Sequence, residues 1–396
     1  MTNAVARLVS LLTVGAVAAL TLSISVRSSA QEPIEFEAPG AGTGAGQGTI
    51  ATDINWEGAI VGNYALPTNA FGAYMRSPRG KFTTLNAPGA GAGANQGTSA
   101  WSINSKGEIT GYYIDGSNVY HGYVWADDTI TSIDVPGAGA GSGQGTLAYD
   151  INSKGEIAGE YIDGNNVFHG FTLWLGPGAF TSFDAPGAGT GPGQGTLTAS
   201  EDGLTRKASL AGGYLDGSDV YHGLLRVADG TMTEFDVMGA GTGAYQGTNP
   251  GGIDPKDRIS GYYTDGNSVY HGFLRLKDGS ITTFDVPGAG TAPGQGTQGE
   301  NIIAARVIYG QYAAGMIDGQ YIDGNNVYHC FLFAPDPGGV GGTIVTIDDA
   351  PGAGTAPGQG TFAGPINAKG AIAEYYVDQN NVYHGYLIPA PQPPMP

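Results

Sequence analysis

Hydrophobic and polar residues alternate in short runs along most of the chain. Between residues 147 and 187 these runs read LAYDIN (147–152), EIAGEYID (156–163), VFHGFTLW (167–174) and AFTSFDAPG (179–187). Each run is rich in Ile, Val, Tyr, Phe or Thr, and Gly, Asn or Asp bounds it, which is typical of short strands joined by turns. The pattern predicts a four-stranded antiparallel meander, and no segment after residue 30 has a convincing helical period.

The same four-strand unit recurs throughout the sequence. A Gly-rich segment that ends in Gln-Gly-Thr occurs seven times, with its glutamine at positions 47, 96, 144, 194, 246, 295 and 359. The unit is therefore about 50 residues long, with one longer copy, and this period is typical of propeller blades.

The two ends of the chain indicate how the units are closed. IEFEAPGAG (34–42) is a fourth strand without its unit, whereas residues 362–389 hold three strands without a fourth. An N-terminal strand that completes the last blade removes an exposed sheet edge. We therefore expect an all-β fold, a seven-bladed β-propeller of four-stranded antiparallel blades, rather than an open β-solenoid.

Short motifs within the unit support this fold. Gly-Glu-Ile-x-Gly-x-Tyr, followed in the next strand by His-Gly-Phe and then by Phe-Asp-Val-Pro-Gly, resembles the extracellular HAF-type repeats. Gly170 stands where that pattern has alanine, and the Gly-rich loop is longer here. The resemblance implies a secreted propeller and no particular reaction.

The N-terminus resembles an export signal. Arg7 precedes the apolar run 8–26, and Ser28 and Ala30 suit a cleavage site for small residues. The run is also just long enough for an uncleaved anchor. We expect a signal peptide or membrane anchor over residues 1–30, the propeller over 31–388 and a Pro-rich tail over 389–396. The protein would then be secreted, periplasmic or on the cell surface.

Charge and cysteine content narrow the function classes. The chain has 35 Asp and Glu against 16 Lys and Arg, a net charge of −19, so phosphate backbones and anionic membrane surfaces are poor partners. Cys330 is the single cysteine, so no intramolecular disulfide can form and stability must come from packing and strand pairing. We expect a monomer.

The turn YIDGNNVFHG (161–170) and its copies are the candidate binding segments. Aromatic rings, carboxylates and amides suit sugar hydroxyls, and repetition supplies avidity, so multivalent carbohydrate binding is the first hypothesis. The candidate binding residues are Tyr113, Asp115, Asn118, Tyr161, Asp163, Asn166, Tyr214, Asp216, Tyr263, Asp265, Tyr321, Asp323, Asn326 and Asp378. The acidic residues among them also suit Asx-type turn capping, and Ca²⁺ is an alternative for the same carboxylates.

The histidines all fall at one repeat position. They are His121, His169, His222, His271, His329 and His384, while the first unit has Gly72 there. Six imidazoles on separate blades cannot converge on one ion, so we expect structural roles and no metal site. The Asp-Gly-Asn-Asn stretch favours an even, two-residue turn, which places His169 on the sheet face opposite Tyr161 and Asp163.

The Gly-rich loops superficially resemble phosphate-binding loops. A phosphate loop needs a helix N-terminus after it, and here a strand follows. We interpret these glycines as backbone positions that need positive φ or close passage.

Departures from the repeat supply the candidate catalytic residues. Glu160, Asp202, Arg306 and Glu374 stand where other copies carry different residue types or fall in irregular segments. They could serve a glycosidase or polysaccharide lyase with one site at the axial mouth, which is the alternative to a binding protein. Ordinary drift between repeats is the competing explanation. A protein-interaction scaffold is a third possibility, and no cofactor is expected.

Overall fold

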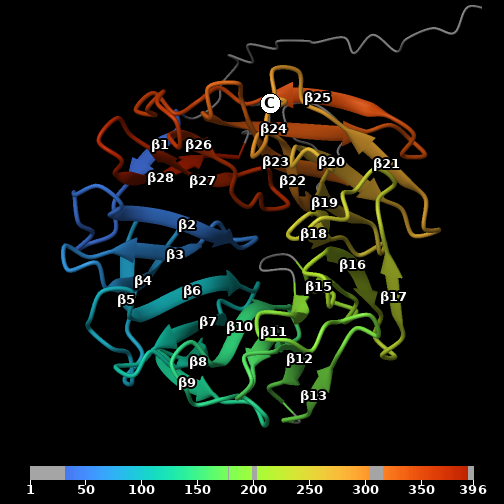
Figure 1. The fold of residues 1–396 in the computed structure, drawn as a ribbon. Helices are drawn as coiled ribbons and strands as arrows, with labels where there is room; N and C mark the ends of the chain where they lie inside the picture. Colours follow the sequence, from blue (N-terminus) through green and yellow to red (C-terminus); the bar gives the residue numbers. More distant parts are fainter. Residues whose placement is uncertain (1–31, 177, 199–202, 304–314, 391–396) are drawn as a thin grey trace, which may run out of the picture.

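The strands of the protein form seven antiparallel blades arranged in a ring. The computed structural model describes residues 32–176, 178–198, 203–303 and 315–390, and over these residues it contains 28 strands and no helix (Figure 1). The expected seven-bladed β-propeller is therefore confirmed. The described part of the chain contains no helix that could cross a membrane.

The bounds of the strands follow the repeat. Blade 1 comprises β2 (Gly48–Ile54), β3 (Ile60–Ala65), β4 (Phe71–Arg76) and β5 (Phe82–Leu85). Blade 2 comprises β6 (Gly97–Ile103), β7 (Ile109–Ile114), β8 (Tyr120–Ala126) and β9 (Thr129–Ile133). Blade 3 comprises β10 (Gly145–Ile151), β11 (Glu156–Ile162), β12 (Phe168–Trp174) and β13 (Phe180–Phe183). Blade 4 comprises β14 (Gly195–Thr198), β15 (Leu210–Leu215), β16 (Tyr221–Arg226) and β17 (Met232–Phe235).

The other three blades repeat the same order. Blade 5 comprises β18 (Gly247–Ile253), β19 (Ile259–Thr264), β20 (Tyr270–Arg275) and β21 (Ile281–Phe284). Blade 6 comprises β22 (Gly296–Ile303), β23 (Met316–Ile322), β24 (Tyr328–Pro335) and β25 (Gly342–Thr346). Blade 7 comprises β26 (Gly360–Phe362), β27 (Ile372–Val377), β28 (Tyr383–Ile388) and, from the other end of the chain, β1 (Ile34–Phe36).

The N-terminal strand completes the last blade, as the offset of the repeat predicts. β1 pairs antiparallel with β28, with Ile34 opposite Leu387 and Phe36 opposite Gly385, and the two strands lie side by side in Figure 1. The Phe36 ring is buried and packs edge-on against Tyr74 of blade 1, with 6.3 Å between ring centroids. The closing contact therefore has its own hydrophobic core as well as backbone pairing.

Each Gln-Gly-Thr segment joins two neighbouring blades through its backbone. At the closing junction, the Tyr383 N–H donates to the Gln47 carbonyl and the Gly46 N–H donates to the Asn381 carbonyl, both at 2.8 Å. The corresponding pair of bonds recurs at the other six junctions at 2.7–2.9 Å. The junction that closes the ring is thus hydrogen-bonded in the same way as the six others.

The threonine of each Gln-Gly-Thr segment accepts a buried hydrogen bond from the backbone at the start of the preceding Gly-rich loop. Thr146 Oγ1 accepts a hydrogen bond from the Val135 N–H at 3.1 Å, and the threonine is fully buried. Equivalent bonds are made by Thr49, Thr98, Thr196, Thr248, Thr297 and Thr361. Because a buried N–H without a partner is costly, each threonine holds the Gly-rich loop against the first strand of its blade.

The hydrophobic core lies between adjacent blades. The largest buried rings include Tyr74, Tyr123, Phe171, Phe273 and Phe331, which share one position on the third strand of their blades. Phe171 packs beneath Gly159, where an added Cβ would lie 2.9 Å from the ring and 2.1 Å from the Leu147 carbonyl. Small residues on the second strand therefore make room for these rings.

The glycine of Gln-Gly-Thr gives a sharp test of the junction. Gly145 has φ of 127°, and a Cβ there would lie 2.0 Å from the Tyr120 carbonyl oxygen of blade 2. We predict that Gly145→Ala lowers the free energy of unfolding by about 4 kcal/mol or more, because both the clash and the backbone conformation oppose it. Chemical denaturation measures the change.

Gly143 supplies the matched control. It has φ of 80°, an added Cβ meets nothing within 4 Å, and Asn95 occupies the equivalent position with φ of 62°. Gly143→Asn should change the free energy of unfolding by less than about 1 kcal/mol. Equal effects of the two substitutions would contradict the junction as described.

Candidate functional site

The turns between the second and third strands of the blades differ from the expected two-residue turn. In blade 3 the last pair of opposed residues is Ile162 and Phe168, so the loop 163–167 has five residues, an odd number. Tyr161 and His169 are consequently direct cross-strand partners. The prediction that they lie on opposite faces is wrong, because backbone bonds between Asp163 and Val167 and the side chain of Asp163 close a longer loop in place of a primed two-residue turn.

That side chain is the aspartate of the turn. Asp163 Oδ1 accepts hydrogen bonds from the Asn165 N–H at 2.8 Å and the Val167 N–H at 2.9 Å. Partial burial alone would raise the pKa of Asp163, but these N–H donors hold the pKa below its usual value. Asn166 has φ of 63°, a left-handed conformation that asparagine tolerates. The aspartates thus cap their turns, one of the roles that the sequence suggested.

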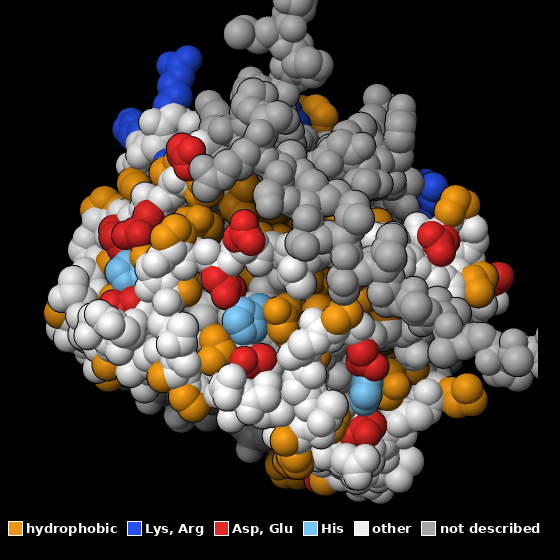
Figure 2. Space-filling view, turned by 90° about the horizontal axis from the view of Figure 1, so that it is seen from above, with side chains coloured by type: hydrophobic (Ala, Val, Ile, Leu, Met, Phe, Trp, Pro, Cys, Tyr) orange, Lys and Arg blue, Asp and Glu red, His pale blue; other side chains and the backbone are white. Residues whose placement is uncertain are grey.

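Each histidine lies between two carboxylates and on a tyrosine ring. His169 Nδ1 is 2.8 Å from Asp184 Oδ1, its Nε2 is 3.8 Å from Asp163 Oδ2, and its ring stacks on Tyr161 at 4.8 Å. The other five histidines repeat this arrangement, with Glu37 as the Nδ1 partner in blade 7. In Figure 2 the visible histidines lie apart from one another, each beside acidic side chains.

Blade 1 lacks the whole unit. Leu66, Gly72 and Asn86 replace the turn aspartate, the histidine and the fourth-strand carboxylate, yet β3 and β4 pair as in the other blades. The Tyr64 ring fills the freed space, since a Cβ on Gly72 would lie 2.2 Å from it. A blade can therefore form without the carboxylate–histidine–carboxylate unit.

Most of the predicted binding groups in the turns are engaged inside the protein. Tyr113, Tyr161, Tyr214 and Tyr263 are only 6–9% exposed, and a histidine covers one face of each ring. The Asn118, Asn166 and Asn326 side chains accept hydrogen bonds from the amides of Gln96, Gln144 and Gln295. Asn165 and Asn166 are exposed at the tip of the turn in blade 3, so the groups that a ligand can reach there are mainly amides and backbone rather than aromatic rings.

The innermost strands border two neighbouring cavities near the axis of the ring. The first has a volume of about 430 Å³, and its walls include Tyr149, Glu160, Thr198, Tyr221 and Tyr262. The second has a volume of about 470 Å³ and includes Phe71, Tyr375 and Tyr383. Trp101 and Glu300 line both, and the described residues of the two walls include no Lys, Arg or His.

Bulges in the innermost strands supply several of these side chains. The pairing of β10 with β11 skips Tyr149 between Ala148 and Asp150, and the pairing of β6 with β7 skips Trp101 in the same way. A bulge leaves one residue unpaired and re-aims its side chain. Trp101 and Tyr149 thereby come together, with ring centroids 5.3 Å apart and nearly perpendicular planes.

Two carboxyl groups of the cavity wall have raised pKa values. Burial raises the pKa of Glu160 to about 7, although the Thr198 N–H at 3.2 Å and the Tyr149 hydroxyl at 3.4 Å donate to it. Burial raises the pKa of Glu300 to about 7 as well. Thr198 Oγ1, also buried in this wall, has no hydrogen-bond partner among the described residues. The wall thus offers hydrogen-bonding groups that the protein does not fully satisfy.

The two candidate catalytic residues that the structure describes, Glu160 and Glu374, do not face the same cavity. Glu160 lines the first cavity, whereas Glu374 on β27 is buried, and its neighbour Tyr375 faces the second cavity instead. Successive residues of a strand point to opposite faces, so Glu160 and Glu374 do not form a carboxylate pair. Burial raises the pKa of Glu374 to about 8. Asp202 and Arg306 lie outside the described residues, as do the segment expected to be an export signal or anchor and residues 391–396 of the expected tail.

An aromatic residue directly before each histidine position was missed by the sequence analysis. These half-buried residues are Phe71, Tyr120, Phe168, Tyr221, Tyr270, Tyr328 and Tyr383. Phe71, Tyr221 and Tyr383 line the cavities. The sequence does carry a signal for them, because blade 1 keeps this aromatic residue although it has lost its histidine.

Comparisons with known proteins identify the architecture. No protein-family model matches the chain, and no curated protein matches it significantly, so the HAF-type resemblance stays a prediction. The lectin BP39L from Burkholderia pseudomallei is 9% identical, with a TM-score of 0.53 over 89% of this chain and 96% of its own. The chain has a β-propeller fold.

Two further solved structures resemble the propeller more weakly. AofleA from Arthrobotrys oligospora is 14% identical, with a TM-score of 0.44 over 83% of this chain and 94% of its own. A puromycin hydrolase is 12% identical, with a TM-score of 0.44 over 90% of this chain and 55% of its own.

The buried glutamate of the first cavity predicts a pH dependence. Between about pH 4.5 and pH 7 the folded protein keeps a proton on Glu160 that the unfolded chain has released, so stability falls as pH rises through this window. Glu160→Gln should reduce the loss of unfolding free energy between pH 5 and pH 8 by about 2–3 kcal/mol. Denaturation curves at the two pH values measure it.

The exposed Glu57 is the control for this experiment. Glu57→Gln removes one exposed glutamate and gives the baseline against which the effect of Glu160→Gln is compared. A Glu160→Gln protein whose stability falls as steeply as that of the parent would contradict a protonated Glu160 in the cavity wall.

Proposed function

We propose that the protein is a carbohydrate-binding propeller whose main site is the first axial cavity. The proposal rests on the cavity wall, which combines aromatic rings with polar groups whose hydrogen-bonding capacity the protein does not fully use. Trp101, Tyr149 and Tyr262 offer ring faces and edges, while Glu160 and Thr198 offer hydrogen-bonding atoms. Sugars present apolar C–H faces and hydroxyls together, and a volume of about 430 Å³ lies within the usual range for small-ligand sites.

The charge of the wall suggests which sugars fit. Among the described residues, two glutamates and no basic residue line the cavity, so a carboxylated or sulfated sugar would find no cationic partner among these side chains. A protonated Glu160 can donate to a hydroxyl, and an ionised Glu160 can accept from one. Neutral glycans are the class that this site favours. Because the likeness to a lectin is a likeness of fold, it assigns no ligand to this chain.

The multivalent hypothesis places weak sites in the repeated turns instead. Its support is the near identity of the turns in six blades, and its weakness is the burial of their tyrosines. We further propose that the protein acts outside the cytoplasm, where polysaccharides are accessible, in line with the export-like N-terminus.

The two binding hypotheses predict different stoichiometries. A neutral-glycan array followed by titration calorimetry should find one site per chain if the axial cavity binds. Trp101→Ala should then weaken binding about tenfold or more, because aromatic anchors in pockets carry a large share of binding energy. Trp56→Ala, which removes a tryptophan that is 52% exposed, is the control and should leave binding unchanged.

Asp163→Ala tests binding by the turns rather than by the cavity. It removes one turn carboxylate out of six and leaves the axial cavity intact, so cavity binding should keep its affinity. Several equivalent sites per chain, insensitive to Trp101→Ala and reduced by Asp163→Ala, would instead support the turns.

One observation favours an enzymatic second candidate. Glu160 and Glu300 line the same cavity and both have a pKa of about 7, as a general acid of a glycosidase requires. A hydrolysis screen on the glycans that bind tests this. Product release that Glu160→Gln abolishes supports catalysis, and binding without turnover supports a lectin-like role.

A further inference from the structure

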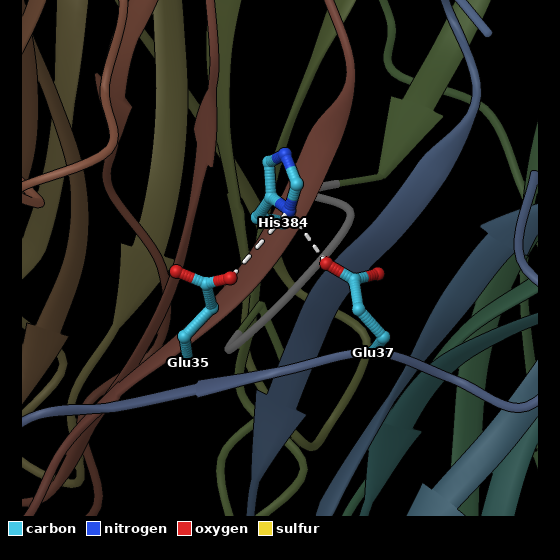
Figure 3. A group of neighbouring side chains, drawn as sticks. All are labelled: Glu35, Glu37 and His384. Atoms are coloured by element: carbon cyan, nitrogen blue, oxygen red, sulfur yellow. Dashed lines mark hydrogen bonds and ion pairs between the residues drawn. The ribbon is translucent and has the colours of Figure 1, made fainter. Parts of the chain in front are cut away.

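The closing seam of the ring carries a cluster of metal-binding donors that the other blades lack. His384 on β28 faces both Glu35 and Glu37, which belong to the N-terminal strand and the residue that follows it (Figure 3). One ligand atom from each side chain lies within 4.8 Å of the other two. Among the described residues, this is the one such group of three His, Cys, Asp or Glu side chains.

The distances suit a small divalent ion after minor side-chain movement. His384 Nδ1 is 2.6 Å from Glu37 Oε1 and 3.9 Å from Glu35 Oε1. Two ligand atoms of a tetrahedral Zn²⁺ ion with bonds of about 2.0–2.1 Å lie about 3.3 Å apart, between these two values. Both glutamates are about half exposed, so their carboxylates can rotate to equalise the distances.

The remaining atoms of the cluster are held as metal ligands usually are. Tyr376 donates to Glu35 Oε2 and Thr49 donates to Glu37 Oε2, both at 2.6 Å, so the Oε1 atoms are left to point at the imidazole. His384 Nε2 faces Asp378 Oδ2 at 3.8 Å, and a metal-bound histidine commonly gives its other N–H to a carboxylate.

The negative charge of the cluster also favours binding of a cation. Two carboxylates converge on one imidazole nitrogen, which carries at most one proton, and neither glutamate forms an ion pair with a described Lys or Arg. A divalent ion in place of that proton balances both carboxylates and releases the proton to solvent. One nitrogen and two carboxylate oxygens favour Zn²⁺ over Ca²⁺, which binds through oxygen ligands.

The other blades show that the repeat alone does not require this cluster. Where blade 7 has Glu35, blades 2 and 3 have Ser132 and Ser182, which bond the tyrosine hydroxyl and leave the histidine with one partner on that side. Blade 4 has Glu234 at the same position, but its Oε1 accepts from the Gly187 N–H of the neighbouring loop. Among the described residues, two carboxylates face the Nδ1 side of a histidine only at the seam.

We propose that Glu35, Glu37 and His384 bind one Zn²⁺ ion, with water completing the coordination, and that this ion fastens β1 to β28. β1 has three residues and is the one strand that reaches its blade from the opposite end of the chain. An ion bound to the folded ring and not to the unfolded chain stabilises the ring by mass action. The site is separate from the axial cavity and does not depend on the proposed sugar binding.

The experiment uses the full-length protein after treatment with a chelator and titrates it with Zn²⁺ alone. Calorimetry should find one site per chain, and saturating Zn²⁺ should raise the thermal unfolding midpoint. Hydrogen exchange should slow at residues 34–38 and in β28, and not at the matching strands of blade 2.

Glu35→Ser is the decisive variant because it recreates the arrangement of blades 2 and 3. It should keep the midpoint of the parent in chelator, lose Zn²⁺ affinity by about tenfold or more, and lose the Zn²⁺-induced rise. Glu234→Ser, the same change in blade 4, is the matched control and should retain both. If Glu35→Ser does not fold, His384→Gln takes its place with the same expected losses.

Three outcomes would overturn the proposal. The first is that Zn²⁺ binds only at adventitious strength, without a change in the unfolding midpoint. The second is that Glu35→Ser binds Zn²⁺ as tightly as the parent. The third is a stoichiometry near six, which would mean that the histidines bind the ion individually.

Discussion

The pairing of β1 with β28 is the contact on which the rest of the structure depends. It brings the N-terminal strand into the last blade and covers the edge of β28, which would otherwise be unpaired. The Gln47 segment then bonds blade 7 to blade 1 as each later copy bonds its own neighbours. The seven junctions carry the same backbone bonds, so each blade is held by its two neighbours.

The same ring separates the repeated groups from the central ones. The carboxylate–histidine–carboxylate units lie at the turn before the third strand, on the third strand and at the end of the fourth strand of six blades, and the contacts between each histidine and its carboxylates stay within the blade. Bulges on the innermost strands of five blades carry different residues, such as Trp101 and Tyr149, and direct them to the axial cavities. We therefore expect ligand binding at the axis, where the copies differ in sequence. We expect metal binding that stabilises the ring at the seam between β1 and β28.

The sequence predicted the ring and misjudged the turns, for physical reasons. Period, strand composition and the displaced strand at residue 34 are properties of whole segments, so they survive local irregularity. Whether Tyr161 faces His169 depends on one residue of loop length, and Asp-Gly-Asn-Asn fits both a two-residue turn and the five-residue loop that Asp163 closes. Bulges that re-aim Trp101 and Tyr149 leave no clear mark in the pattern of alternation. The fold was therefore predictable, whereas the composition of the axial site was not.

A cross-strand disulfide tests the closure of the ring most directly. Ile34 and Leu387 are opposed across β1 and β28, and directly opposed antiparallel residues have Cα atoms about 4.5–5.5 Å apart, within reach of a disulfide. With cysteines at both positions, the account predicts that the folded protein forms the bond under mild oxidation and that thiol titration then finds only the buried Cys330. Two thiols at 34 and 387 that stay free in the folded protein would contradict a ring closed by its N-terminal strand.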